Sequence, residues 1–182
     1  MANVAIVYGS KEGQTGKIAG FIADALMEQG QAVELVDGHR PPSAFALDAF
    51  DGVIVGSSVH VGKHDEKIVD FVKQNLDALR TRPSAFFSVS LTAVGTQDPD
   101  KDRQDLERLL AEFSAQTGWQ PDMQGVFAGA LRYSRYNPIV RFVMKKIAGR
   151  HGGDTDTSQD YEYTDWRDVT RFVTEFAGAL GA

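Results

Sequence analysis

The residues best suited to chemistry lie in the loop Ser10-Lys11-Glu12-Gly13-Gln14-Thr15, which follows a short apolar run and opens a helix-like segment. Two hydroxyl side chains and the first backbone N–H groups of that helix would face one point, and this set of donors suits a single phosphate. Gly13 permits a close approach of the backbone or a positive φ. The alternative interpretation is an ordinary helix with a Ser/Thr cap after a glycine turn.

The loop does not match the two best-known phosphate motifs. A triphosphate loop, G-x-x-x-x-G-K-[ST], that ended at Gly16-Lys17 would need Gly at position 11 and Ser or Thr at position 18, where the chain has Lys11 and Ile18. The missing hydroxyl is the one that binds magnesium in such loops. The loop also lacks the G-x-G-x-x-G spacing of the dinucleotide fingerprint. These residues therefore predict one phosphate rather than three.

Short β-rich runs alternate with helix-like periods along the chain. This alternation predicts right-handed βαβ units, with helices on both faces of a parallel sheet. We predict a single α/β domain of 182 residues, with five strands in the order 2-1-3-4-5. The expected strands span 4–8, 32–37, 52–58, 84–91 and 124–131, and the expected helices span 15–29, the segment after the third strand, the region around 106–113 and the segment from about 164. Thr164 is the expected N-cap of the last helix.

Two further loops are expected beside the first one. Sheets of this kind bind ligands where the strand order reverses, beyond the carboxyl ends of the strands. The loops that follow the third and fourth strands are small and polar and reach a glycine, so they can lie against a flat ring and offer backbone groups to its edge. They are Ser57-Ser58-Val59-His60-Val61-Gly62 and Ser90-Leu91-Thr92-Ala93, the second running on to Gly95.

Composition excludes several classes of function. The 182 residues include no Cys, so disulfides, thiol catalysis, Cys-ligated zinc and Fe–S clusters are ruled out, and no metal site is predicted. The net charge of −6 argues against nucleic acid as a partner. No apolar run approaches the ~20 residues that span a bilayer, and the first residues do not resemble a signal peptide. A cytoplasmic location is expected.

The Ser-x-x-Gly-x-Thr pattern of Ser10–Thr15, together with the two later loops, resembles the flavodoxin family, whose fold binds FMN at this switch point. Other segments are similar to one branch of that family, the menaquinone-dependent protoporphyrinogen IX dehydrogenases of haem biosynthesis. These segments are SKEGQTGKIA, VDGHR, PSAFFSVSL, GALRYSRYN, GGDTDTS and YTDW. The resemblance extends from about Val4 to Phe176.

The resemblance implies a flavodoxin-like three-layer sandwich with non-covalently bound FMN. It also implies oxidation of protoporphyrinogen IX, with a membrane quinone as the electron acceptor. On this basis Ser10 to Thr15 hold the FMN phosphate, and the loops 57–62 and 90–93 flank the isoalloxazine ring. Neither of these two loops contains Trp or Tyr, and an open ring face could admit a large substrate.

A basic insertion is expected over residues 132–163, because about thirty residues are far more than a strand-to-helix connection usually takes. Positions 132–153 contain no acidic residue, although the net charge of the chain is −6. After Pro138, apolar side chains are expected on one side of a helix, opposite Arg141 and Lys145. Three interpretations stay open: contact with an anionic membrane at the inner face of the cell, pairing with porphyrin propionates, or a solvated basic face. The candidate residues are Arg132, Arg135, Arg141, Lys145 and Lys146.

No catalytic acid or base is predicted from the sequence. Of the four histidines, His60 is the best placed, because it lies in the loop expected at the flavin edge. Three other functions stay open: a soluble one-electron carrier, an NAD(P)H:quinone reductase on the same fold, and an FMN-binding module without activity. A carrier should have stacked aromatics and an acidic docking face, and a reductase needs a nicotinamide site. The oligomeric state is not predicted.

Overall fold

The computed structural model describes residues 1–95, 98–135, 138–150 and 154–181, and the side chains of residues 135, 140, 143, 147 and 150 lie outside that description. Five parallel strands form the main sheet in the order β2-β1-β3-β5-β6. They are β1 Asn3–Gly9, β2 Ala32–Asp37, β3 Gly52–His60, β5 Ser84–Ser90 and β6 Met123–Ala128. The predicted order is confirmed, since the extra short strand β4 (Lys63–His64) only forms an antiparallel hairpin with β3.

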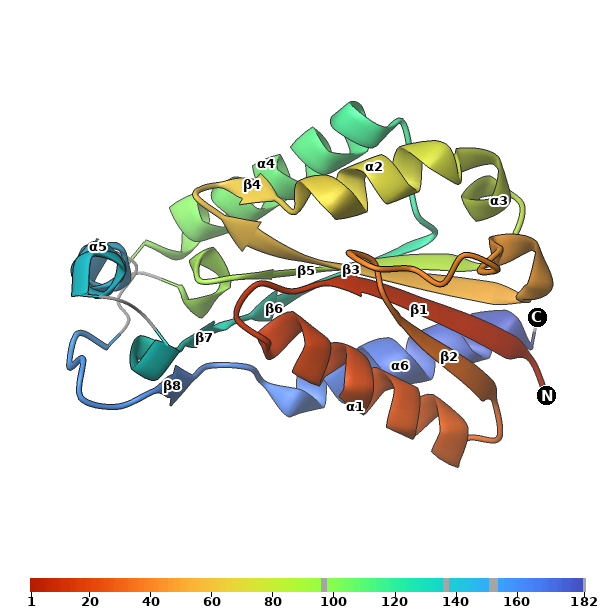
Figure 1. Cartoon of the computed structure of the whole chain (residues 1–182), viewed down its shortest axis with the longest axis horizontal. Coiled ribbons are helices and arrows are strands. Elements are labelled where there is room, and N and C mark those ends of the chain that lie inside the picture. The colour runs from red at the N-terminus through yellow and green to blue at the C-terminus, as the bar shows by residue number, and fades with distance from the viewer. Residues whose placement is uncertain (96–97, 136–137, 151–153, 182) are drawn as a thin grey trace.

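Helices cover both faces of this sheet (Figure 1). On one face lie α1 (Gln14–Glu28) and α6 (Trp166–Leu180), and on the other lie α2 (Glu66–Gln74), α3 (Leu76–Arg80) and α4 (Pro99–Thr117). The described residues also form short 3-10 turns, which are η1 Leu47–Ala49, η2 Thr92–Val94 and η3 Tyr133–Arg135. The predicted three-layer sandwich is therefore confirmed.

Alternation along the strands divides the core between the two faces. In β1, Val4 and Ile6 pack in the cluster under α1 and α6, whereas Ala5 and Val7 pack in the cluster under α2 and α4. All four side chains are fully buried. Because both faces of a parallel sheet are covered, its central strands read as continuous apolar runs. Each fully buried Val or Ile contributes about 1.5–3 kcal/mol to the free energy of unfolding. This packing fixes the positions of the strands whose ends carry the loops.

Several predicted boundaries shift by one or two residues in the structure, and two differences change the contacts near the carboxyl ends of the strands. The fifth strand of the sheet ends at Ala128 rather than at residue 131, because Ala130 and Leu131 (β7) leave the sheet and pair with β8 (Tyr161–Glu162). The last helix is capped by Asp165, whose carboxylate accepts from the amide of Arg167 at 2.9 Å. Thr164 is therefore not the cap, and its hydroxyl donates to the carbonyl oxygen of Ala128 at 2.7 Å.

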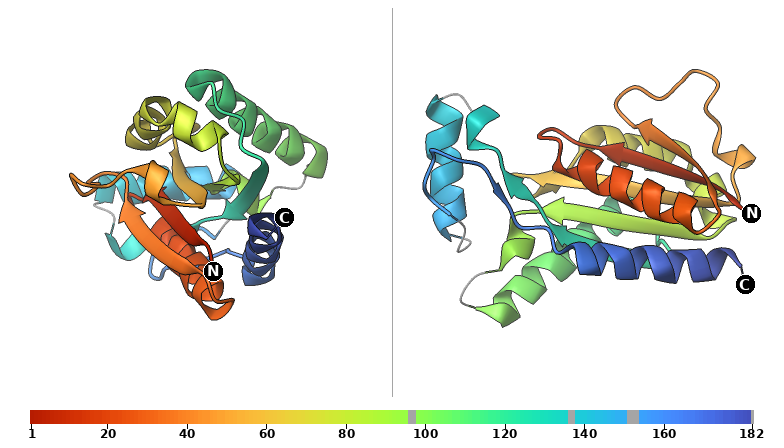
Figure 2. Two further views of the ribbon diagram at one scale, coloured as in Figure 1. Left: turned by 90° about the vertical axis from the view of Figure 1, so that its right-hand side faces the viewer. Right: turned by 90° about the horizontal axis from the view of Figure 1, so that it is seen from below.

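The insertion forms its own small unit beyond the carboxyl ends of the strands. Its two legs are paired as β7 and β8, and α5 (Pro138–Arg150) lies across the end of the molecule, opposite both termini (Figures 1 and 2). The expected helix after Pro138 is confirmed. Within the described part of the chain, no helix is long and apolar enough to cross a membrane.

Candidate functional site

The loop between β1 and α1 has the geometry of an anion site. Gly13 is the N-cap residue of α1, has a positive φ of 98°, and makes no side-chain capping bond. Its amide donates to the hydroxyl oxygen of Ser10 at 3.0 Å, which closes the loop on itself. The first amides of any helix have no partner inside the helix. Here they lie with the positive end of the helix dipole at the carboxyl end of the sheet, where they can hold a negative group.

A cavity opens beside this loop at the carboxyl ends of the strands. It is a shallow hollow: the space between its walls is about 390 Å³ when the open solvent at its mouth is included, and about 50 Å³ of it is enclosed. The predicted residues on its walls are Ser10, Glu12, Gln14, Thr15, Ser58, Val59, His60, Ser90 and Leu91. The walls also include Val89, Gly129, Ala130 and Met144. The structure thus brings the three predicted loops together, and Met144 of α5 adds the insertion to the same cavity.

The remaining predicted loop residues lie around the cavity rather than on its walls. They are Lys11, Gly13, Ser57, Val61, Gly62, Thr92 and Ala93. Ser57 bonds within the protein: its Oγ donates to the carbonyl oxygen of Ser58 at 3.2 Å and accepts from the amide of Asp65 at 3.0 Å. Val61 and Gly62 form the exposed turn of the β3–β4 hairpin, with φ values of 49° and 73°.

Ser58 is a residue of the cavity wall and has a buried hydroxyl. The residue is 7% exposed, and its Oγ has no hydrogen-bond partner among the described residues. A buried polar atom without a partner costs about 1–3 kcal/mol, so a ligand that bonds to it would remove that cost. On the neighbouring strand, the Ser90 Oγ accepts from the amide of Ala93 at 3.3 Å.

His60 stands at the cavity wall as a neutral imidazole. Burial lowers the pKa of His60 below its usual value of 6.5, while the charge of Glu12 raises it and the charge of Lys11 lowers it further. A neutral histidine can accept a proton at pH 7. Within the described ranges, no group of three or more His, Cys, Asp or Glu side chains could hold a metal ion.

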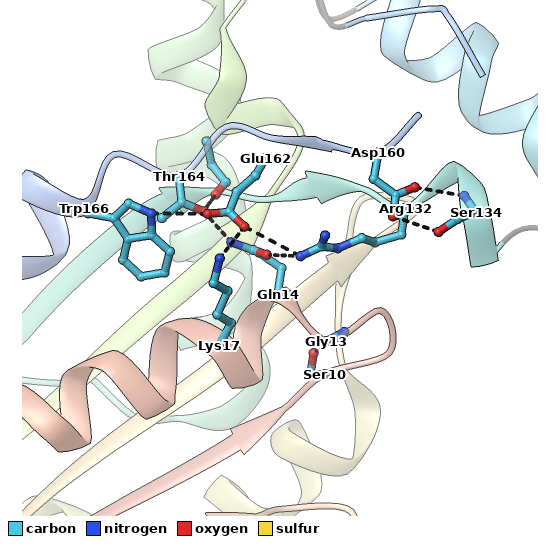
Figure 3. Close-up of polar contacts among 11 residues, drawn as sticks. Ser10, Gly13, Gln14, Lys17, Arg132, Ser134, Asp160, Glu162, Thr164 and Trp166 are labelled. Atoms are coloured by element: carbon cyan, nitrogen blue, oxygen red, sulfur yellow. Dashed lines mark hydrogen bonds and ion pairs between the residues drawn. The ribbon is translucent and has the colours of Figure 1, made fainter. Parts of the chain in front are cut away.

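Arg132 points back toward α1 rather than outward. Its Nη2 lies 2.9 Å from Gln14 Oε1 and 3.6 Å from Glu162 Oε2, and Figure 3 shows the guanidinium joined to both side chains. The side chain of Arg132 is 24% exposed. The structure therefore separates Arg132 from the basic residues of α5. The side chain of Arg135 lies outside the described residues.

The exposed side of α5 mixes apolar and basic side chains. Ile139 and Phe142 are 77% and 59% exposed, and Lys145 and Lys146 are exposed as well. The Nζ atom of Lys146 lies 4.9 Å from the centroid of the Phe142 ring. We call these four residues the outer face of α5.

The inner side of α5 also differs from the sequence prediction. Arg141 is half-buried together with Met144, and Ala148 is buried. Residues spaced by three and seven positions share one side of a helix, so Arg141 lies on the side that meets the domain. The expectation of apolar residues on one side and basic residues opposite is wrong for the described side chains. The cause is the small core of the insertion, which takes Met144 and Ala148.

Comparisons with known proteins agree with this geometry. A family model described as "Flavodoxin domain" matches residues 5–158. The chain belongs to the flavodoxin domain family. It is 36% identical over 172 residues to the "Protoporphyrinogen IX dehydrogenase [quinone]" of Escherichia coli (strain K12), and the match covers 94% of this chain and 93% of that protein. The protein of the same name from Leishmania major is 35% identical over 176 residues, which cover 94% of this chain and 73% of that protein.

Solved flavodoxins share the fold of this family member. Oxidised flavodoxin 1 from Bacillus cereus aligns with a TM-score of 0.53 at 18% identity, over 97% of both chains. A flavodoxin from the domain Archaea aligns with a TM-score of 0.52 at 17% identity, over 99% of both chains. At this level of identity the comparison establishes the shared fold and no finer property.

The residues of the cavity fit FMN, which flavodoxin domains typically bind. The closed loop at Gly13 and the first amides of α1 suit a phosphate ester. Thr15, which is 1% exposed, is a residue of the same wall. The buried Ser58 Oγ, which lacks a partner among the described residues, suits a ligand with polar ring edges.

Sequence reasoning missed several residues of this site. Gly129 follows β6, and its amide donates to the carbonyl oxygen of Ser90 at 3.0 Å. The predicted strand order already places the end of the fifth strand beside the fourth, so this neighbour could have been found. Met144 could not have been found, because the sequence near an inserted helix does not show where that helix packs. Lys17 reads as an ordinary surface residue, but its Nζ lies 2.7 Å from Glu162 Oε2.

Proposed function

We propose that this member of the flavodoxin domain family is an FMN-dependent oxidoreductase that dehydrogenates protoporphyrinogen IX to protoporphyrin IX and delivers the electrons to a quinone. This is a step of haem biosynthesis. The observation that carries the proposal is the 36% identity over 172 residues to a protein named for this reaction. That match covers 94% of the chain.

The cofactor proposal assigns each loop a part. Ser10, Thr15 and the first amides of α1 hold the phosphate, and the segments 57–62 and 90–93 flank the ring. When bound, FMN supplies the redox chemistry, accepting electrons from the porphyrinogen and passing them to the quinone. The chain itself binds and orients the cofactor, and His60 offers a neutral imidazole at the wall for a proton that leaves the substrate.

The walls of the cavity favour an enzyme over a soluble electron carrier. Among the described wall residues there is no Trp or Tyr, so the stacked aromatic pair expected of a carrier is missing from them. The wall from the insertion is the flexible, apolar side chain of Met144, which suits contact with a large ring. If FMN binds here, a large flat substrate would meet the part of the cavity wall formed by Val59, His60 and Met144.

We further propose that the outer face of α5 rests on the anionic inner surface of the cell membrane, where the quinone is dissolved. Ile139 and Phe142 would enter the boundary between headgroups and acyl chains, because exposed apolar side chains gain from leaving water. Lys145 and Lys146 would attract anionic headgroups, and a Lys near such a surface contributes about 1 kcal/mol. The protein is thus proposed as a cytoplasmic enzyme with a peripheral membrane contact.

A steady-state assay tests the proposed reaction. Purified protein loaded with FMN, mixed without oxygen with protoporphyrinogen IX and a soluble quinone, should produce fluorescent protoporphyrin together with quinol. Omitting the quinone should limit the product to at most one protoporphyrin for every three FMN groups, because this oxidation removes six electrons and each FMN accepts two. If the loaded protein reduces the quinone with NADPH and does not oxidise the porphyrinogen, the chain is an NAD(P)H:quinone reductase instead.

A further inference from the structure

Gln14 connects the candidate phosphate loop to both legs of the insertion (Figure 3). The residue is 4% exposed and belongs to the first turn of α1. Its side-chain Oε1 accepts from Arg132 Nη2 at 2.9 Å, 118 residues along the chain. Its Nε2 donates to Thr164 Oγ1 at 2.8 Å, 150 residues along the chain. The buried side-chain amide of Gln14 therefore joins both ends of the insertion to α1, the helix that follows the loop.

A second set of contacts reinforces this junction. Glu162 Oε2 lies 2.7 Å from Lys17 Nζ and 3.6 Å from Arg132 Nη2. Glu162 Oε1 accepts from Trp166 Nε1 at 3.2 Å, and Lys17 Nζ lies 5.2 Å from the centroid of the Trp166 ring. Burial raises the pKa of Glu162, but the hydrogen bond and charge of Lys17 and the charge of Arg132 outweigh it, so the pKa is lowered. The carboxylate therefore stays ionised between two cations.

The junction is linked to α5 through the small core of the insertion. Asp160 accepts from the amide and the hydroxyl of Ser134 at 2.9 Å and 2.7 Å, which fastens the two legs to each other. Leu131, Tyr133 and Ala148 form a buried cluster, against which Met144 and Leu91 pack. Leu91 and Met144 are also cavity walls. A shift of the legs would therefore move the α5 wall of the cavity.

We propose that Gln14 and Arg132 are positioning residues that couple the phosphate loop to the insertion. The backbone of Gln14 is in the turn that would face the cofactor phosphate, while its side chain is held by the insertion. A fixed Gln14 stabilises both the phosphate loop and the contacts of the insertion with α1. Binding of phosphate in the loop therefore favours these contacts, and these contacts favour phosphate binding. Such coupling is reciprocal, with a factor commonly between about 5 and 150. This inference rests on the proposed cofactor and not on the porphyrinogen reaction.

Comparing FMN with riboflavin separates this coupling from a general loss of structure. Riboflavin has the same ring system and lacks the phosphate. Arg132→Met should weaken FMN binding about tenfold and change riboflavin binding by less than about twofold, as measured by quenching of flavin fluorescence. Gln14→Leu should have a similar effect, and the double variant should bind FMN no more weakly than the weaker single variant. Arg171→Met, which removes an exposed Arg of α6 (68% exposed side chain), is the matched control and should bind both flavins as the wild type does.

The insertion supplies a second readout, which does not depend on flavin binding. Inorganic phosphate can fill the loop without reaching Met144, so it should slow tryptic cleavage within α5 of the wild-type protein. In Arg132→Met this protection should be lost. Equal losses of FMN and riboflavin binding, additive effects in the double variant, or no protection by phosphate would each overturn the coupling. If the wild type binds riboflavin as tightly as FMN, the proposed phosphate site itself fails. If Arg132→Met does not fold, Arg132→Gln takes its place.

Discussion

The hydroxyl oxygen of Ser10 accepts a hydrogen bond from the amide of Gly13 at 3.0 Å, and this bond holds the candidate phosphate loop in shape. Gly13 has φ 98°, a conformation that costs a residue with a Cβ about 1–2 kcal/mol. We expect Gly13→Ala to weaken FMN binding about tenfold, since relief of the strain would turn the first amides of α1 away from the phosphate. Fluorescence titration with FMN measures this effect.

Gly30 provides the control for that variant. It follows the other end of α1 with φ 82°, and a Cβ placed there meets no atom within 4 Å. Gly30→Ala should therefore lower the free energy of unfolding by a similar amount and leave FMN binding unchanged. Equal FMN affinities of the Gly13 and Gly30 variants would contradict the assigned role of the loop.

The buried hydroxyl of Ser58 gives a second prediction. Since Ser58 Oγ has no partner among the described residues, Ser58→Ala should leave the free energy of unfolding of the cofactor-free protein unchanged or slightly raise it. The same variant should bind FMN about fivefold more weakly, because a hydrogen bond to the cofactor contributes about 1 kcal/mol.

Ser57→Ala should show the reverse pattern, because Ser57 bonds to Ser58 and Asp65 inside the protein. It should lower the free energy of unfolding by about 1 kcal/mol while FMN binding changes little. Urea unfolding and FMN titration of the two variants make the comparison. A Ser58→Ala protein with wild-type FMN affinity would remove Ser58 from the site.

His64 predicts a dependence of stability on pH. The side chain is 8% exposed, its Nε2 lies 2.9 Å from Ser88 Oγ, and burial lowers its pKa from 6.5 to about 4. Between these two values the unfolded chain binds a proton that the folded protein does not. Stability from this group is therefore complete above pH 6.5 and falls with pH, by about 3 kcal/mol in total at pH 4.

Urea unfolding of the wild type and of His64→Gln between pH 4 and pH 7 tests this assignment. The difference in the free energy of unfolding between the two proteins should shrink as the pH falls through this range. Other acid-sensitive groups act equally in both proteins and cancel in the difference. Parallel pH profiles would show that the pKa of His64 is not lowered in the folded state.

The membrane proposal predicts a loss of binding to anionic vesicles. Charge reversal of Lys145 and Lys146 to Glu should weaken sedimentation with phosphatidylglycerol-containing vesicles about tenfold or more, since each Lys near such a surface contributes about 1 kcal/mol. Phe142→Ser should weaken binding to the same vesicles through lost apolar burial.

Charge reversal of Lys73 and Lys101, which are exposed in α2 and α4, is the matched control because it changes the net charge equally. Binding should survive that change. If both double variants lose binding to the same degree, net charge rather than the outer face of α5 governs the attraction.

Much of the fold could be predicted because its signals are local. Val4 and Ile6 alternate with Ala5 and Val7 in a continuous apolar run, as a strand buried on both faces requires. The carboxyl ends of parallel strands meet at one edge, so the expected strand order alone places the loops at Ser10, Ser58 and Ser90 together, and all three line the cavity.

The contacts of the insertion could not be predicted in the same way. Arg132 and Gln14 are 118 residues apart, and nothing near either residue signals the pairing. Thr164 suits a cap by its residue type and position, yet Asp165 takes that role and Thr164 bonds to Gln14. A long-range polar contact overrides a local preference at this point, and it lies beside the candidate cofactor site.

Anaerobic single-turnover mixing tests the central claim most directly. Protein loaded with FMN is mixed with protoporphyrinogen IX in the absence of quinone and oxygen, and the visible absorption of the oxidised flavin is followed. This absorption should be lost, and the fluorescent porphyrin formed should be at most one molecule for every three flavins, because six electrons leave each porphyrinogen and one FMN accepts two. Added quinone should restore the absorption. A flavin that keeps its absorption with protoporphyrinogen, in protein shown to bind FMN, would contradict the proposed function.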